Sequence, residues 1–247
     1  MKDPVRAPLA AIAEGERAID AAASHYLVHV LRLAPGSRFV AFDPARAIEA
    51  DAEIAEIAHG VATVRIGAPR AAKVVARRPT VWIHAIAKGD KTDAIVRDAT
   101  ELGATRIVLA LAERSVVKID DARARAKLAR WTKIAREAAR QSGRADAPEI
   151  DGPHAWSDAL ARAPKEGARF CLHPAADAPR LGPLLADALA GAAPLAFAAG
   201  PEGGLTPAEL EASERAGFRI ASLGPFVLRT ETVPAAVLGT ARVLDRG

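Results

Sequence analysis

The sequence predicts an α/β protein in which a parallel sheet covered by helices follows a smaller N-terminal β domain. From Thr80 onward, apolar strand-like runs alternate with helical patterns, which is typical of a parallel sheet with helices on both faces. Before about residue 68, several short strand-like runs follow one another, which is typical of a small barrel. A chain of 247 residues is long enough for two modest domains with ample cores.

Composition narrows the class of protein. Half of the residues are hydrophobic but only 4% are aromatic, so we expect helices to pack through small side chains. A single cysteine, Cys171, excludes an internal disulfide framework and fits a reducing compartment. The N-terminus shows no signal-peptide pattern, and no apolar run approaches the roughly 18 residues of a membrane span. We therefore expect a soluble, cytoplasmic protein.

The N-terminal part contains one helical pattern and three strand-like runs. The helical pattern covers Ala21–Leu33 and is ended by Pro35 and Gly36. The expected strands are Arg38–Phe42, Glu49–Ile57 and Val61–Ile66. Gly67–Pro79 combines turn formers with four cations and has no clear period, so we expect a linker there. The predicted domains are residues 1–70 and 71–247.

The larger C-terminal part alternates between the two kinds of element. Its expected strands are Val81–Ala87, Arg106–Leu111, Arg169–His173, Leu195–Ala199 and Arg219–Leu223. Its expected helices are Thr92–Leu102, Ala122–Ser142, Leu181–Ala190, Pro207–Ala216 and Pro234–Leu244. Ligands of such sheets bind at the carboxyl ends of the strands, so the loops leaving the last strands are where we expect a site.

Positive charge is concentrated between Arg114 and Arg144. This segment holds ten cations and three acids, a surplus of seven, whereas the whole chain has a net charge of +4. On the expected helix, cations spaced four residues apart destabilise it by a few tenths of a kcal/mol per pair unless a polyanion lies nearby. A solvated charged face is the alternative, but the distribution favours nucleic acid bound through its phosphates.

Two loops carry residues suited to chemistry. Between Ala199 and Pro207, three glycines and a proline surround Glu202, so a ligand can approach the backbone closely. A carboxylate there repels phosphate and suits a hydroxyl group, an amine or a cationic cofactor. The pair Thr206-Pro207 is typical of a helix start, so an ordinary strand-to-helix turn is the alternative.

The second loop lies within Phe218–Pro234. A short strand leads to a Gly224-Pro225 turn, and Arg229-Thr-Glu-Thr precedes the final helix, for which Thr230 and Thr232 are the expected N-caps. Arg229 is a permanent cation in an apolar loop, so it requires an anionic partner if it is not simply a surface side chain. A ligand is one such partner.

Several common sites are absent from the sequence. No G-x-G-x-x-G follows the first α/β strand and no G-x-x-x-x-G-K-S/T occurs, which argues against a Rossmann dinucleotide site and a P-loop. No H-E-x-x-H or paired C-x-x-C occurs, so we expect no metal. Of the six histidines, only His173 ends an expected strand, and Cys171 lies in an apolar run typical of an inert thiol.

Seven sequence blocks in a fixed order are similar to those of one family. They are His29–Gly36, Lys88–Lys91, Ala99–Gly103, Glu113–Lys118, Glu137–Arg144, Gly200–Gly204 and Leu223–Thr232. Together they resemble the RsmE family of small-subunit (16S) ribosomal RNA uridine-N3 methyltransferases, which belongs to the SPOUT superfamily. The resemblance covers essentially the whole chain. It implies a SPOUT-type parallel sheet with a C-terminal trefoil knot, preceded by a PUA-like RNA-binding barrel.

The resemblance also implies the cofactor, the partners and the roles of individual residues. The methyl donor would be S-adenosyl-L-methionine (SAM), the substrate 16S rRNA in the small ribosomal subunit, and the active form a homodimer. The catalytic residues would be Arg229, Glu202 and Glu231, with the choice of base between the two carboxylates left open. Cofactor contacts would come from Leu172, His173, Ala199, Gly200, Pro201, Glu202, Leu223, Gly224, Pro225, Val227, Leu228 and Thr230. RNA contacts would come from Arg32, Lys88, Lys91, Arg114, Lys118, Arg123, Lys127, Arg130 and Arg144.

The chain departs from the family pattern at three places. Its first dozen residues lack the aromatic, Arg-rich opening that is frequent in the family, Arg140 stands where an acid is common, and Val233-Pro234 replaces small residues. Two other functions stay open. One is another SPOUT RNA methyltransferase, acting on tRNA or on ribose 2′-OH, and the other is a catalytically silent rRNA-binding assembly protein.

Overall fold

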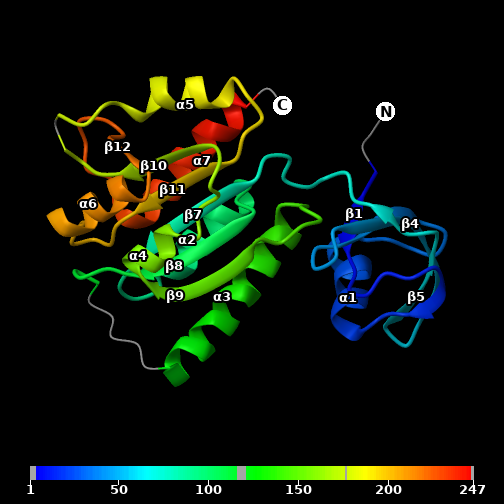
Figure 1. The fold of residues 1–247 in the computed structure, drawn as a ribbon. Helices are drawn as coiled ribbons and strands as arrows, with labels where there is room; N and C mark the ends of the chain where they lie inside the picture. The colour runs from blue at the N-terminus through cyan, green and yellow to red at the C-terminus, as the bar shows by residue number, and fades with distance from the viewer. Residues whose placement is uncertain (1–3, 116–120, 176, 246–247) are drawn as a thin grey trace. The chain divides into compact units, whose positions relative to one another are not determined.

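The structure, a computed structural model, describes residues 4–115, 121–175 and 177–245. The described residues fall into two compact units. One contains the chain up to Val75 together with Ala139–Ala147, and the other contains Ala76–Ala138 together with the chain from Pro148 onward. Figure 1 shows the elements of each unit.

The N-terminal unit is built on a six-stranded sheet. Its strands are β1 (Arg6–Pro8), β2 (Gly15–Ala18), β3 (Arg38–Asp43), β4 (Ile48–Ala58), β5 (Val61–Ile66) and β6 (Arg70–Ala71). They lie in the order β1-β3-β4-β5-β2, and β6 pairs with β4. The three expected strands are confirmed. The expectation of a linker without regular structure over Gly67–Pro79 is wrong at β6, which is too short to show a period.

The expected helix of this unit is shorter than predicted. It forms α1 (Ala21–His25), which continues as the π-helix η1 (Tyr26–Val30). Residues 31–33 lie outside it, and Arg32 has a φ of 55°. The left-handed backbone at Arg32 ends the helix before Pro35, where the sequence placed its end.

The larger unit contains a parallel six-stranded sheet. Its strands are β7 (Thr80–Ala85), β8 (Arg106–Leu111), β9 (Glu149–Ala155), β10 (Ala168–Leu172), β11 (Leu195–Ala199) and β12 (Arg219–Ala221). They lie in the order β12-β10-β11-β7-β8-β9, and every pair is parallel. The five expected strands and the parallel sheet are confirmed. The sequence did not predict β9, which contains Gly152-Pro153 and has no fully buried residue.

Helices cover both faces of this sheet, as predicted. They are α2 (Lys91–Glu101), α3 (Asp121–Gln141), α4 (Trp156–Leu160), α5 (Leu181–Leu189), α6 (Pro207–Arg215) and α7 (Val233–Leu244). Alternate residues of β7 point to opposite faces: Trp82 packs with residues of α2, α3, α5 and α7, whereas Val81 and Ile83 pack with residues of α4.

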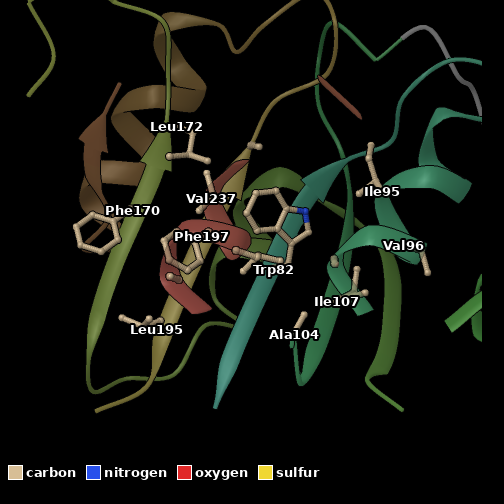
Figure 2. Packing of buried hydrophobic residues seen from close by; sticks show 14 of the residues in the cluster. Trp82, Ile95, Val96, Ala104, Ile107, Phe170, Leu172, Leu195, Phe197 and Val237 are labelled. Carbon is tan, nitrogen blue, oxygen red and sulfur yellow. The ribbon is translucent and has the colours of Figure 1, made fainter. Parts of the chain in front are cut away.

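The core on the first face is built around three aromatic rings. Figure 2 shows Trp82, Phe197 and Phe170 on three neighbouring strands, with Leu172 at the end of β10. The ring centroids of Phe197 and Phe170 are 5.8 Å apart, and those of Trp82 and Phe197 are 6.1 Å apart. These rings hold the strands in register and therefore fix where the strand ends lie.

The two predicted helix starts differ in outcome. Thr206 caps α6 in a capping box with Glu209, and Pro207 occupies the first turn, as predicted. Thr232 is the N-cap residue of α7, as predicted, although its side chain makes no capping hydrogen bond, whereas the expected cap at Thr230 is wrong. The Thr230 hydroxyl is used elsewhere, as described below. No helix within the described ranges is long and apolar enough to cross a membrane.

Candidate active site

A cavity opens where β10, β11 and β12 end. Water-sized molecules can occupy about 130 Å³ of it, and the surrounding atom-free space, which includes open solvent, is about 700 Å³. The structure brings eleven of the twelve predicted cofactor residues to its wall, and Pro225 is the exception. The lining residues are Leu172, His173, Pro174, Ala199, Gly200, Pro201, Glu202, Gly204, Leu205, Leu223, Gly224, Phe226, Val227, Leu228, Thr230 and Val233.

Two glycines of the loop that carries Glu202 have no room for a side chain. A Cβ on Gly200 would lie 2.9 Å from the Leu205 Cγ, and a Cβ on Gly203 would lie 3.0 Å from the Arg114 Cβ. Gly224 has a φ of 142°, a conformation that other residues rarely adopt. The guanidinium of Arg114 also donates a hydrogen bond to the Gly203 carbonyl (3.1 Å), which holds the loop from the outside.

Lys91, at the start of α2, joins the two predicted catalytic carboxylates. Its Nζ lies 3.0 Å from the Glu202 Oε1 and 3.6 Å from the Glu231 Oε2. The Glu202 Oε1 also accepts a hydrogen bond from the backbone N–H of Lys88 (3.1 Å). The Glu231 Oε2 is buried and accepts no hydrogen bond from the described part of the chain.

These contacts set the charge of the cluster. Partial burial raises the pKa of Glu202, but hydrogen bonds from its own backbone N–H, from Lys91 and from Lys88 outweigh that effect. The net result is a Glu202 pKa below its usual value. The hydrogen bond to Glu202 raises the pKa of Lys91. Glu202 and Lys91 are therefore an ion pair at neutral pH.

Arg229 immediately precedes this cluster and is exposed. In contrast to Lys91, its guanidinium makes no hydrogen bond or ion pair with the residues that the structure describes. A permanent cation beside a cavity, without an anionic partner in the chain, is suited to bind an anionic or electron-rich part of a ligand.

His84 is a buried polar residue of the site that the sequence did not predict. Its ring is fully buried at the end of β7, where it contacts Trp82 and Thr230. Burial lowers the pKa of His84 to about 3, despite the opposing influence of Glu202, so the ring is neutral. No local pattern marks this residue, because its partner Thr230 is 146 positions away.

The predicted RNA-binding residues are found in three kinds of environment. Arg32, Lys88 and Arg123 are exposed, and Arg114 lies at the glycine loop. On α3, Arg130 pairs with Asp93, and the Lys127 Nζ lies 5.5 Å from the centre of the Trp131 ring. Arg144 is only 6% exposed and pairs with Asp146, so it is poorly placed for a phosphate contact. Lys118 lies outside the described residues.

Other titratable groups are less suited to catalysis. Burial raises the pKa of Cys171 to about 12, which makes the thiol inert, as predicted. In the described ranges, no three His, Cys, Asp or Glu side chains are grouped as a metal site would require.

A parallel sheet with a cavity at the carboxyl ends of its strands is the arrangement of many α/β enzymes. The RNA methyltransferase domain family matches residues 76–242, and the RNA methyltransferase PUA domain family matches residues 19–67. Because the first match covers well over half of the chain, the chain belongs to the RNA methyltransferase family.

Curated relatives and a solved structure identify the branch. The ribosomal RNA small subunit methyltransferase E of Bacillus subtilis is 40% identical over 156 residues, which are 61% of this chain and 60% of that protein. That of Synechocystis is 32% identical over 235 residues, 94% of this chain and 75% of that protein. The crystal structure of the Neisseria gonorrhoeae enzyme bound to S-adenosyl methionine superposes with a TM-score of 0.81, at 27% identity and 98% coverage of both chains. The chain therefore belongs to the ribosomal RNA small subunit methyltransferase E family, as the sequence blocks indicated.

Proposed function

We propose that this protein methylates N3 of a specific uridine in 16S rRNA, with SAM as methyl donor. One observation carries the proposal. Three separate loops meet at one cavity with Glu202 on its wall, and Arg229 and Glu231 are the chain neighbours of the lining residue Thr230. The family membership supports the same reaction, although the matched stretch spans less than two thirds of the Bacillus subtilis relative.

The residues of the cavity fit SAM. Leu172, Leu223 and Leu228 offer apolar surface for an adenine ring, and the glycines leave backbone groups accessible. Glu202 is ionised and lies on the wall, where its charge suits a sulfonium cation or sugar hydroxyl groups. SAM supplies an electrophilic methyl group when bound.

The chain's own residues then have to prepare the uracil ring. N3 of uridine is a weakly acidic imide and a poor nucleophile while protonated, so the site must remove its proton or stabilise the resulting anion. We assign the stabilisation to Arg229, whose free guanidinium can hold a uracil oxygen as negative charge develops. Positioning of the ring in line with the methyl group supplies much of the remaining acceleration.

We assign proton removal to Glu231 and an orienting role to Glu202. Glu202 is a weak base because its pKa is lowered and its Oε1 already accepts two hydrogen bonds. The Glu231 Oε2 faces only the Lys91 ammonium, at 3.6 Å, which is longer than a hydrogen bond, so the described chain holds Glu231 less tightly than Glu202. A Glu231→Gln variant that methylates as fast as the wild type would contradict this assignment.

We propose that RNA binds to the N-terminal unit and to the exposed cations of α3. The sheet β1-β3-β4-β5-β2 would form a PUA-like barrel, with the domain boundary near residue 70. The side chains of Lys133 and Arg136 are exposed on α3 and suit phosphate contacts.

We further propose a homodimer, with a C-terminal trefoil knot in each subunit. Large apolar side chains are exposed next to the cavity and at the end of α7: Phe226 (81%), Val227 (78%) and Val243 (84%). Burial of this surface against a second copy would remove apolar area from water. Sedimentation tests the dimer, and an active monomer would contradict it. Pulling on both chain ends tests the knot, because a knotted chain stays shorter than its full contour length.

Nucleoside analysis tests the function itself. We propose that the protein acts in the cytoplasm. In a strain that lacks it, we expect 16S rRNA to contain one N3-methyluridine fewer. Incubation of that rRNA or of its small subunits with the protein and SAM should restore the modified nucleoside. A modified ribose or a modified tRNA would instead favour another RNA methyltransferase, and SAM binding without any methylation would favour an assembly protein.

A further inference from the structure

Three consecutive hydrogen bonds behind the cavity wall connect β7, the loop after β11 and the segment before α7. The Trp82 Nε1 donates to the His84 Nδ1 (3.1 Å), the His84 Nε2 contacts the Thr230 Oγ1 (2.8 Å), and that hydroxyl donates to the Gly200 carbonyl (2.9 Å). Trp82 and His84 belong to β7, Gly200 follows β11, and Thr230 begins the short 3-10 helix η2 (Thr230–Thr232) before α7.

The direction of each hydrogen bond is fixed by chemistry. An indole N–H is only a donor, so the His84 Nδ1 must be the acceptor and the ring must carry its proton on Nε2. The Nε2–H therefore donates to Thr230. The Thr230 hydroxyl accepts that bond and has one proton left, which it donates to Gly200. The line can run in only one direction.

This line joins two walls of the cavity. Gly200 and Thr230 both line it, whereas His84 and Trp82 are buried behind them. His84 is also the register partner of Ala199, the residue directly before Gly200. The bond from Thr230 replaces the helix capping that its position suggested, and it ties the segment with Arg229 and Glu231 to the glycine loop with Glu202.

We propose that His84 is a positioning residue: through Thr230 it holds the two walls of the cavity at the spacing that the cofactor requires. The inference rests on the proposed function of the cavity as the SAM site. Because Thr230 stands between Arg229 and Glu231 in the chain, the same contact also fixes the backbone positions of these two residues.

The experiment compares four variants with the full-length wild type by calorimetry with SAM and by methyl-transfer kinetics. Thr230→Val keeps the shape of the side chain but removes both hydrogen bonds of the hydroxyl. His84→Ala removes the ring, whereas in His84→Gln an amide can still accept from Trp82 and donate to Thr230. Ser213→Ala is the matched control, since Ser213 is also buried, accepts from the Trp156 Nε1 and donates to a carbonyl, but does not line the cavity.

We expect Thr230→Val and His84→Ala to weaken SAM binding and raise the KM for SAM at least tenfold, with the KM for RNA unchanged. His84→Gln should restore most of the affinity, and Ser213→Ala should lower thermal stability without changing either KM. If His84 and Thr230 only stabilised the fold, every variant would contain a smaller fraction of folded enzyme. The apparent kcat would then fall and both KM values would stay unchanged.

The possible results separate the inference from the proposed function. A wild type that binds no SAM would overturn both. Normal SAM binding by the wild type, together with unchanged affinity in folded Thr230→Val, would overturn the role of His84 alone. If His84→Ala does not fold, Thr230→Val and His84→Gln still decide the question, because each keeps a side chain of similar size.

Discussion

Gly200→Ala is a sharp test of the cavity wall. The added Cβ would lie 2.9 Å from the Leu205 Cγ, whereas ordinary contacts begin at 3.4 Å, so the two groups must separate by about half an ångström. Leu205 is buried in the core and also lines the cavity, so a shift of its side chain disturbs the core packing or narrows the cavity. Overpacking of this kind costs about 1–3 kcal/mol.

The strain relaxes by moving Leu205 toward the cavity, the loop that carries Glu202, or the carbonyl that binds Thr230, and each of these movements alters the cavity wall. If the whole cost appears in binding, SAM affinity falls about 5- to 150-fold, at about 1.4 kcal/mol per factor of ten. Calorimetry with SAM measures this change, and thermal melting measures the effect on stability. The control is Gly239→Ala in α7, where a Cβ meets no atom within 4 Å and the helix should gain up to about 1 kcal/mol. Wild-type SAM affinity and stability in Gly200→Ala would refute the close-packed wall.

Three further predictions follow from the geometry. Arg229→Ala should keep SAM affinity but lower the methyl-transfer rate at least about 100-fold, as loss of one stabilising donor does in other enzymes; normal turnover would exclude its role. His84 stays neutral in the folded protein, whereas in the unfolded chain it takes up a proton below about pH 6.5. Protonation therefore favours the unfolded state, and the free energy of unfolding should fall by about 2 kcal/mol from pH 7 to pH 5. Denaturant titration at both pH values measures this loss, which should shrink in His84→Gln. Replacing Lys133 and Arg136 by Gln should reduce the slope of RNA affinity against salt by about 1.5, and an unchanged slope would place the RNA elsewhere.

The sequence predicted elements whose pattern is long or strongly apolar. The strands around Trp82, Ile107 and Phe197 are buried on both faces, so their apolar runs are unbroken. Prediction from the sequence missed strands whose pattern is short or mixed. β9 is only partly buried, and β1 pairs with β3 over three residues. Such strands are held by pairing with a neighbour, and that neighbour cannot be identified from the strand's own residues.

The candidate site divides in the same way. The glycine loop and the segment from Leu223 to Thr232 are contiguous motifs, so their convergence could be expected from the strand ends. The role of Thr230 could not, because local sequence favours capping whereas the fold places a histidine and a carbonyl within 2.9 Å of its hydroxyl. A buried hydrogen bond to a distant partner outweighs a local cap that water can replace.

Lys91 shows how the fold changes the interpretation of a charge. In the sequence it belongs to a basic block and suits a phosphate, but in the structure its ammonium lies between Glu202 and Glu231. Two carboxylates close together raise the pKa of one another unless a cation lies between them. Lys91 therefore helps to keep Glu202 ionised, and the same ammonium faces the Glu231 Oε2 at 3.6 Å. The fold therefore uses the charge of Lys91 within the chain, whereas the Arg229 guanidinium pairs with no carboxylate of the described residues and stays available to an anionic group of a ligand.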